Sequence, residues 1–97
     1  MRYAIEFATE AARDYRSLDA HVRGIVRDAI ETHLRHQPTK TSKSRIKRLR
    51  GLLRPQYRLR IDDLRVFYDV TEATVQILAI VEKSRTHEWL ERCGEKS

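Results

Sequence analysis

Three arginines on two neighbouring segments are the residues best suited to chemistry in this sequence. Both segments alternate apolar and polar side chains, which is typical of β-strands, and only the pair Asp62-Asp63 separates them. A two-residue turn at that pair sets the register of a β-hairpin, with Arg60 directly opposite Arg65. Because directly opposed residues share a face, we expect one face of the hairpin to carry the guanidinium groups of Arg58, Arg60 and Arg65.

The other face of the same hairpin is apolar or aromatic at every position, so a shift by one residue would bury the arginines. This predicted core face carries Tyr57, Leu59, Ile61, Leu64, Val66 and Tyr68. Arginines directly opposite each other repel, and a sequence selected only for a stable sheet would avoid the pair. Three guanidinium groups instead suit a phosphate whose charge grows in a transition state. The alternative is that each arginine pairs with a carboxylate such as Asp69, or simply reaches water.

A third strand pattern, over residues 74–81, is apolar on both faces and is therefore predicted to be central in the sheet. It would deliver Lys83, Arg85 and His87 to the end of the sheet, where they complete the set of catalytic candidates. An imidazole such as His87 can exchange a proton near neutral pH. The alternative for each of the three is a solvated loop between strand and helix. The remaining histidines, at positions 21, 33 and 36, are expected to be surface residues.

Basic side chains are concentrated in one block of the chain. Residues 35–65 carry eleven basic and two acidic side chains, a net charge of +9, whereas the flanking segments carry −1 and −2. Such a block binds polyanions by counterion release, although a solvated face is the plainer alternative. The residues expected to contact RNA or another polyanion are Lys43, Arg45, Lys47, Arg48, Arg50 and Arg54. Trp89 is more often a core residue, but it is also a candidate for stacking on a base.

No pattern for a cofactor or metal accompanies these cations, so neither is expected. The chain has no Gly-rich phosphate loop and no carboxylate cluster suited to magnesium, and Cys93 has no partner for zinc or a disulfide. A lone cysteine fits a reducing compartment. The start of the chain lacks a secretory apolar region and no apolar run is long enough to cross a membrane, so we expect a cytoplasmic protein without membrane contact.

The remaining patterns predict one α+β domain over residues 1–97. Thr9 and Asp19 are candidate N-caps of two amphipathic helices, and Pro38 ends the second. The segment 46–53 is basic and is either a loop or the start of a strand. The expected order is β-α-α-β-β-β-α, a helical hairpin packed on a small antiparallel sheet, with strands over 3–7, 56–61, 64–70 and 74–81 and a last helix over 86–92.

Several of these segments together resemble the RelE/ParE superfamily of toxins from type II toxin–antitoxin systems, and most closely its RelE-like members. The resemblance covers nearly the whole chain. It is carried by the segments Tyr3–Phe7, Ile46–Leu52, Tyr57–Arg60, Leu64–Val70 and Leu78–Lys83. The leucine-glycine step followed by Tyr-Arg-Leu-Arg and Arg-Val-Phe-Tyr is the most specific part. These motifs are much less specific for the activity than for the superfamily.

The resemblance implies a toxin that is neutralised by a cognate antitoxin, RelB-like or of another family, within a toxin–antitoxin hetero-oligomer. RelE-type members cut mRNA on the ribosome without a metal: the 2′-hydroxyl attacks the adjacent phosphate, and basic residues stabilise the charge. Those residues fall where Arg58, Arg60 and Arg65 stand, with more near Lys83 and Arg85. ParE-type members share the fold and poison DNA gyrase instead.

Two departures from the RelE-like pattern affect proton transfer. RelE-like enzymes often carry a C-terminal tyrosine with a role in that step, and Trp89 stands at the matching position. The first two strand cations are arginines rather than lysines, and arginine is a poor base. His87 is the candidate substitute. We therefore expect a ribosome-dependent mRNA endoribonuclease, with a gyrase inhibitor or a catalytically silent relative as the alternatives.

Overall fold

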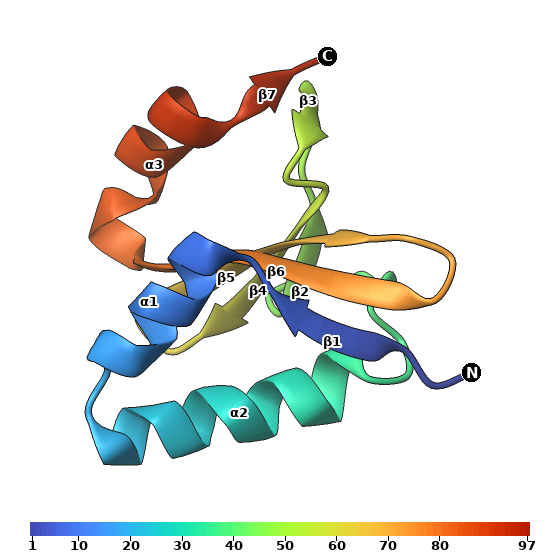
Figure 1. The fold of residues 1–97 in the computed structure, drawn as a ribbon. Coiled ribbons are helices and arrows are strands. Elements are labelled where there is room, and N and C mark those ends of the chain that lie inside the picture. Colours follow the sequence, from blue (N-terminus) through green and yellow to red (C-terminus); the bar gives the residue numbers. More distant parts are fainter.

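A five-stranded sheet forms the middle layer of the computed structural model, which describes all 97 residues. The strands run in the order β1-β6-β5-β4-β2, with α1 and α2 against one face and α3 against the other (Figure 1). A separate pair, β3 and β7, lies on the α3 side. The strands are β1 Ala4–Phe7, β2 Ile46–Arg48, β3 Leu52–Arg54, β4 Tyr57–Ile61, β5 Leu64–Val70, β6 Thr74–Glu82 and β7 Glu95–Lys96. The helices are α1 Thr9–Ser17, α2 Ala20–Leu34, a 3₁₀ turn Lys83–Arg85 and α3 Thr86–Cys93.

The predicted α+β class is confirmed, but the sheet is mixed rather than wholly antiparallel. Strand β1 pairs in parallel with β6, so that Ile5 lies opposite Val75. Helices α1 and α2 follow β1 and lead the chain away from it, so β1 is not joined to its neighbour by a tight turn. This makes a parallel pairing with β6 feasible. The other pairs in this sheet are antiparallel. Strand β6 lies inside the sheet, between β1 and β5, although β5 rather than β6 is the middle strand.

The β4–β5 hairpin has the predicted register at all five pairs. Ile61 lies opposite Leu64 and Arg60 lies opposite Arg65, across the two-residue turn. Asp62 adopts a left-handed backbone conformation, with φ of 49°, which an aspartate tolerates better than most residues. The turn and the side-chain alternation thus fix the same register independently.

The predicted ends of the two helices agree with the structure in part. Ala8, not Thr9, is the N-cap residue of α1, because its N–H still donates to the Ile77 carbonyl (2.8 Å) and keeps it extended. Asp19 caps α2 as predicted, accepting from the Val22 N–H (2.9 Å). Helix α2 ends at Leu34, before Pro38, and the basic segment 46–53 holds β2 and the start of β3.

The main core lies between the sheet and the α1–α2 hairpin. Its buried residues come from α1 and α2 and from strands β2, β4, β5 and β6. They include Val26, Ile30, Leu59, Val66 and Tyr68. The Tyr68 hydroxyl donates to the Pro38 carbonyl (2.7 Å), which fixes the loop after α2. None of the helices is both long and apolar enough to cross a membrane.

A second, smaller core lies under α3 on the opposite face of the sheet. Trp89 stacks on Phe67 with ring centroids 4.8 Å apart and planes 6° from parallel. Its indole N–H donates to the Glu10 carboxylate of α1 (2.6 Å). Trp89 therefore anchors α3 to both the sheet and α1, and the rest of this sheet face stays open for polar side chains.

Candidate nucleic-acid interface

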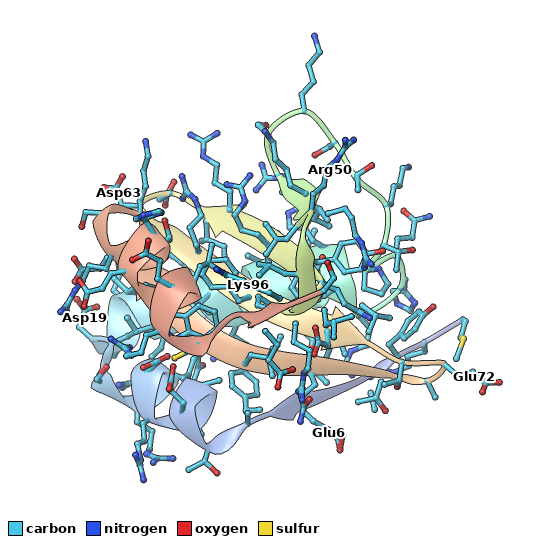
Figure 2. The ribbon with its side chains drawn as sticks, turned by 90° about the horizontal axis from the view of Figure 1, so that it is seen from above. Glu6, Asp19, Arg50, Asp63, Glu72 and Lys96 are labelled. Carbon is cyan, nitrogen blue, oxygen red and sulfur yellow. The ribbon has the colours of Figure 1, made fainter.

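Five basic side chains lie together on the part of the sheet that α3 leaves open. Arg58 lies opposite Lys47 of β2, and Arg60 lies opposite Arg65 of β5. Arg45 is beside Arg60, whose N–H donates to the Arg45 carbonyl (2.8 Å), and both line one small cavity. We call Arg45, Lys47, Arg58, Arg60 and Arg65 the cationic face. Figure 2 looks down on this side of the molecule, where nitrogen-tipped side chains gather between the labelled Asp63 and Arg50.

No carboxylate forms an ion pair with any residue of the cationic face. The carboxylate considered as a partner, Asp69, is buried and pairs with Arg54 instead (2.7 Å). It also accepts the Gln56 N–H (2.8 Å), so it is fully used in shaping the segment before β4. The idea that Asp69 neutralises the arginine trio is therefore wrong, and the only carboxylates near the cationic face are those of the turn, Asp62 and Asp63, which form no ion pair with it.

Arg65 is held rigidly at the centre of this face. Only 6% of the residue is exposed, and its Nη1 donates to the backbone carbonyls of Asp62 (2.8 Å) and Leu64 (2.9 Å). A guanidinium group has five N–H donors, so three remain. No buried side-chain nitrogen in the structure lacks a partner, which means that these remaining donors reach the surface. Arg65 thus presents its remaining N–H groups to a ligand in a fixed orientation.

The electrostatics of the trio show how close the arginines are. Burial, and then the charges of Arg65 and Arg60, hold the pKa of Arg58 below its usual value. Burial and the charge of Arg60 likewise lower the pKa of Arg65, which Asp63 at the turn partly offsets. Both shifts mean that the folded protein disfavours these positive charges in the absence of an anion. A bound phosphate would supply the missing negative charge.

The structure does not bring all three candidates after β6 to the cationic face. Lys83 lies beside the hairpin turn, where its N–H donates to the Asp63 carbonyl (2.7 Å). Arg85 instead lines a cavity between α1 and α3, together with acidic residues such as Glu10 and Glu88. His87 is two residues from Trp89 and so points to the opposite side of α3. Its side chain is 88% exposed and pairs with Glu91 (3.1 Å).

Trp89 is a core residue, which is the commoner role of a tryptophan, and the alternative that it stacks on a base is wrong. The residue is only 7% exposed, and both its ring face and its N–H are used within the protein. An unpaired indole N–H is costly to bury, and the Glu10 carboxylate removes that cost. Sequence spacing alone gave no sign of Glu10, which lies 79 residues away.

The other basic residues of the predicted interface divide into two groups. Arg48 and Arg54 have partners: the Arg48 guanidinium lies 5.1 Å from the Tyr57 ring centroid, and Arg54 contacts Asp69 and Gln76. Lys43 and Arg50 lie exposed in the loops on either side of β2. Because Tyr57 faces helices α1 and α2, Arg48 lies on that side of the sheet and is separated from the arginine trio. No three His, Cys, Asp or Glu side chains meet in a way that would hold a metal ion.

A family model described as the ParE toxin of the type II toxin–antitoxin system parDE matches residues 5–87. The chain belongs to this toxin family. The match spans both the helical hairpin and all four strands that carry the core and the cationic face. No curated protein matches the sequence.

Solved structures of toxin–antitoxin proteins share the fold of this toxin. A chain of the RelBE2 toxin–antitoxin complex from Mycobacterium tuberculosis is 25% identical, with a TM-score of 0.72 over 84% of this chain and 99% of that one. A chain of the RelB–RelE complex from Methanococcus jannaschii is 18% identical, with a TM-score of 0.64 over 87% and 96%. The YoeB dimer from Staphylococcus aureus gives 19% identity and a TM-score of 0.63 over 81% and 94%.

Proposed function

We propose that this toxin is a metal-independent, ribosome-dependent mRNA endoribonuclease whose cationic face stabilises the charge of the cleaved phosphate. The observation that carries the proposal is the arginine trio, which converges on an open part of the sheet without any carboxylate partner. A protein that needed only a stable sheet would gain nothing from this arrangement. The resemblance to RelE-like toxins supplies the reaction class.

In the proposed reaction, the 2′-hydroxyl of the RNA attacks the adjacent phosphorus, and the bond to the leaving 5′-oxygen breaks. The 2′-hydroxyl gives up its proton and the leaving 5′-oxygen takes one up, so the products are a 2′,3′-cyclic phosphate and a 5′-hydroxyl. Water can then open the cyclic phosphate to a 3′ phosphate. Arg65 would bind the non-bridging oxygens through its free N–H groups, with Arg58 and Arg60 beside it. These groups are preorganised where charge develops, which is the main source of such stabilisation. Lys83, near the turn, extends the positive field toward one end of the site.

The proposed partners follow from the same comparisons. The relatives from M. tuberculosis and M. jannaschii are described as complexes of toxin and antitoxin. We infer that a cognate antitoxin, RelB-like or of another family, also binds this toxin in a hetero-oligomer. The ribosome would position the message, because a protein of 97 residues has little surface left to hold a long substrate.

Purified toxin should cut mRNA on programmed ribosomes and barely cut the same RNA alone. The products should carry 5′-hydroxyl ends, and cleavage of a minimal model RNA should persist after chelation of divalent ions. Mapping 5′ ends of cellular mRNA after brief induction tests the same point in cells. Intact mRNA after induction would contradict the proposal.

The match to the ParE toxin family favours a second candidate, a DNA gyrase inhibitor. ParE-type members of the superfamily have that activity, and a gyrase inhibitor does not need a convergent anion site. Supercoiling assays with purified gyrase separate the two. Loss of supercoiling with intact mRNA selects the inhibitor, and no effect in either assay marks a catalytically silent relative.

Arg65→Met is the sharpest test of the site. Methionine retains much of the buried side-chain volume but removes the charge and the phosphate donors. We expect a loss of about two to three orders of magnitude in the single-turnover cleavage rate, on the scale of about 3–4 kcal/mol for one transition-state contact. Circular dichroism at the assay temperature checks that the fold persists. Arg13→Gln, an exposed α1 position, removes the same charge and should retain the wild-type rate.

A further inference from the structure

A polar pocket at the C-terminal end of α2 is lined by cations and lacks any carboxylate. Its volume is about 340 Å³, and its walls come from the last turn of α2, the following loop and the start of β2. The groups able to contact an anion are His33, His36, Lys40, Ser42 and Arg45. The sequence patterns assigned these histidines to the surface one at a time, so the pocket was missed.

The basic side chains around this pocket have no acidic partner. None of the four basic side chains forms an ion pair. Glu31 interacts electrostatically with His36, but its carboxylate already accepts hydrogen bonds from Nε and Nη2 of Arg35. Burial, and then the charge of Arg45, lower the pKa of His33. The positive charges of Lys40 and Arg45 therefore have no carboxylate beside them, and a bound anion would favour the protonated form of His33.

The hydrogen-bonding groups of the pocket are also arranged as donors. The Ser42 oxygen accepts the N–H groups of Arg45 (3.0 Å) and Ile46 (3.3 Å), which leaves its own hydroxyl proton free. Nδ1 of His36 lies 3.2 Å from the Met1 carbonyl oxygen. When Nδ1 donates there, Nε2 becomes a second donor once the imidazole is protonated. A ligand rich in acceptor oxygens suits this set.

Arg45 connects the pocket with the cationic face. It lines the pocket beside α2 and also lines the small cavity that contains Arg60. Strand β2 is the edge strand of the sheet, so no further strand separates the two sites. A chain of phosphates can therefore run from the arginine trio around the β2 edge to the end of α2.

We propose that this pocket binds a second backbone phosphate of the RNA strand whose scissile phosphate lies on the cationic face. The inference rests on the proposed function for its ligand class, because it takes RNA as the polyanion. The pocket contributes affinity and orientation, and the arginine trio contributes the chemistry. The Lys40 ammonium group and the Ser42 hydroxyl would contact the phosphate oxygens, with His33 and His36 at its sides.

Anisotropy of labelled single-stranded RNA, without ribosomes, tests the pocket by substrate length. For an oligonucleotide of about ten nucleotides, Lys40→Gln should weaken binding about threefold to tenfold and lower the salt slope by about 0.7, the value for one phosphate contact on a single strand. A dinucleoside monophosphate has one phosphate, so Lys40→Gln should leave its binding unchanged while Arg65→Met weakens it. Arg13→Gln is the charge-matched control.

Equal losses for Lys40→Gln and Arg13→Gln would overturn the proposal, because only overall charge would then matter. A second readout is the imidazole signal of His33 in NMR, whose pKa should rise when the oligonucleotide binds. A response to a glutamate-rich peptide but not to RNA would also overturn it, in favour of a protein partner. Failure of the proposed function has a different signature: absence of cleavage on ribosomes, with these binding results intact.

Discussion

Arg60 and Arg65 oppose each other across two hydrogen-bonded strands, and their repulsion is a cost that the fold carries. Like charges directly opposite destabilise a sheet by roughly 0.2–1 kcal/mol. Burial adds to the cost at Arg65, which only backbone carbonyls and the charge of Asp63 at the turn compensate. Strain of this kind is expected where a site is organised for a ligand rather than for the stability of the free protein.

Arg60→Gln should therefore make the free toxin more stable and less active. Arg60 is exposed, so the change removes the repulsion without leaving a cavity. We expect the free energy of unfolding in urea to rise by up to about 1 kcal/mol, while RNA cleavage slows. Arg13→Gln, with the same charge change on α1, should leave both unchanged. A fall in stability for Arg60→Gln would show that this arginine has an attractive partner.

The residues of the site differ in how far sequence alone could identify them. The arginine trio was predictable, because a two-residue turn and a strict alternation agree on one face. Trp89 and His33 were not, since their environments come from segments far away in the chain: Glu10 for the indole and the loop around Arg45 for the imidazole. Burial and contacts that come from such distant segments leave no periodic pattern in the local sequence.

At the scale of elements, α1 has a second role beyond covering the core. Strand β1 ends at Phe7, so the later part of β6 has no strand on that side. The Asp14 carboxylate of α1 fills the gap by accepting the Ile80 N–H (2.9 Å). A free strand edge is a liability for aggregation, and a helix laid along it is one of the ways to protect it.

Burial raises the pKa of Asp14, against the lowering effect of the Ile80 N–H, and the charge of Glu10 adds to the rise. The folded state thus binds the Asp14 proton more tightly than the unfolded state, in which the pKa of this carboxyl is near 3.8. Between these two values stability falls as the pH rises, because folding then takes up a proton. Above the folded pKa, the full cost of the buried charge is present.

Asp14→Asn keeps an acceptor for Ile80 and removes the charge, so it should stabilise the protein near neutral pH. The advantage over the wild type should shrink as the pH falls through the folded pKa of Asp14 toward 3.8. Urea unfolding at several pH values measures the difference. Asp28→Asn, which removes an exposed carboxylate from α2, accounts for the change in net charge. An advantage that grew toward acid pH would show that the charged form stabilises the fold.

The elements themselves show the limit of sequence patterns. The β4–β5 hairpin was fixed by local signals, whereas β1 pairs with β6 across about seventy intervening positions, and only the assembled layers decide that pairing. Strand β7 consists of only Glu95 and Lys96, which pair with β3. A strand of two residues is too short to show an alternating pattern in the sequence. Short edge pairings of this kind depend on where α3 ends, and that depends in turn on Trp89.

For the whole molecule, the charge distribution matters more than the net charge of +6. The segment 35–65 supplies β2, the exposed loops around it and all three arginines of the trio. The acidic side chains lie mainly in the segments on either side, including the cavity between α1 and α3. Positive charge is therefore concentrated around β2, the β4–β5 hairpin and the loops beside them, and a polyanion or an acidic partner approaches this part of the toxin preferentially.

Association with the antitoxin should accordingly depend strongly on salt if an acidic segment covers the basic side. Charge steering acts over about 8 Å at physiological ionic strength, so stopped-flow association rates should fall steeply as salt is added. The double variant Lys43→Gln/Arg50→Gln removes two exposed loop cations and should flatten this dependence. Arg13→Gln/Arg16→Gln removes the same charge from α1 and should preserve it. The dissociation rate should change little in either variant, because steering acts on the encounter rather than on the bound contacts. A rate independent of salt in the wild-type protein would show that the antitoxin docks elsewhere, on the apolar surface of the helical hairpin.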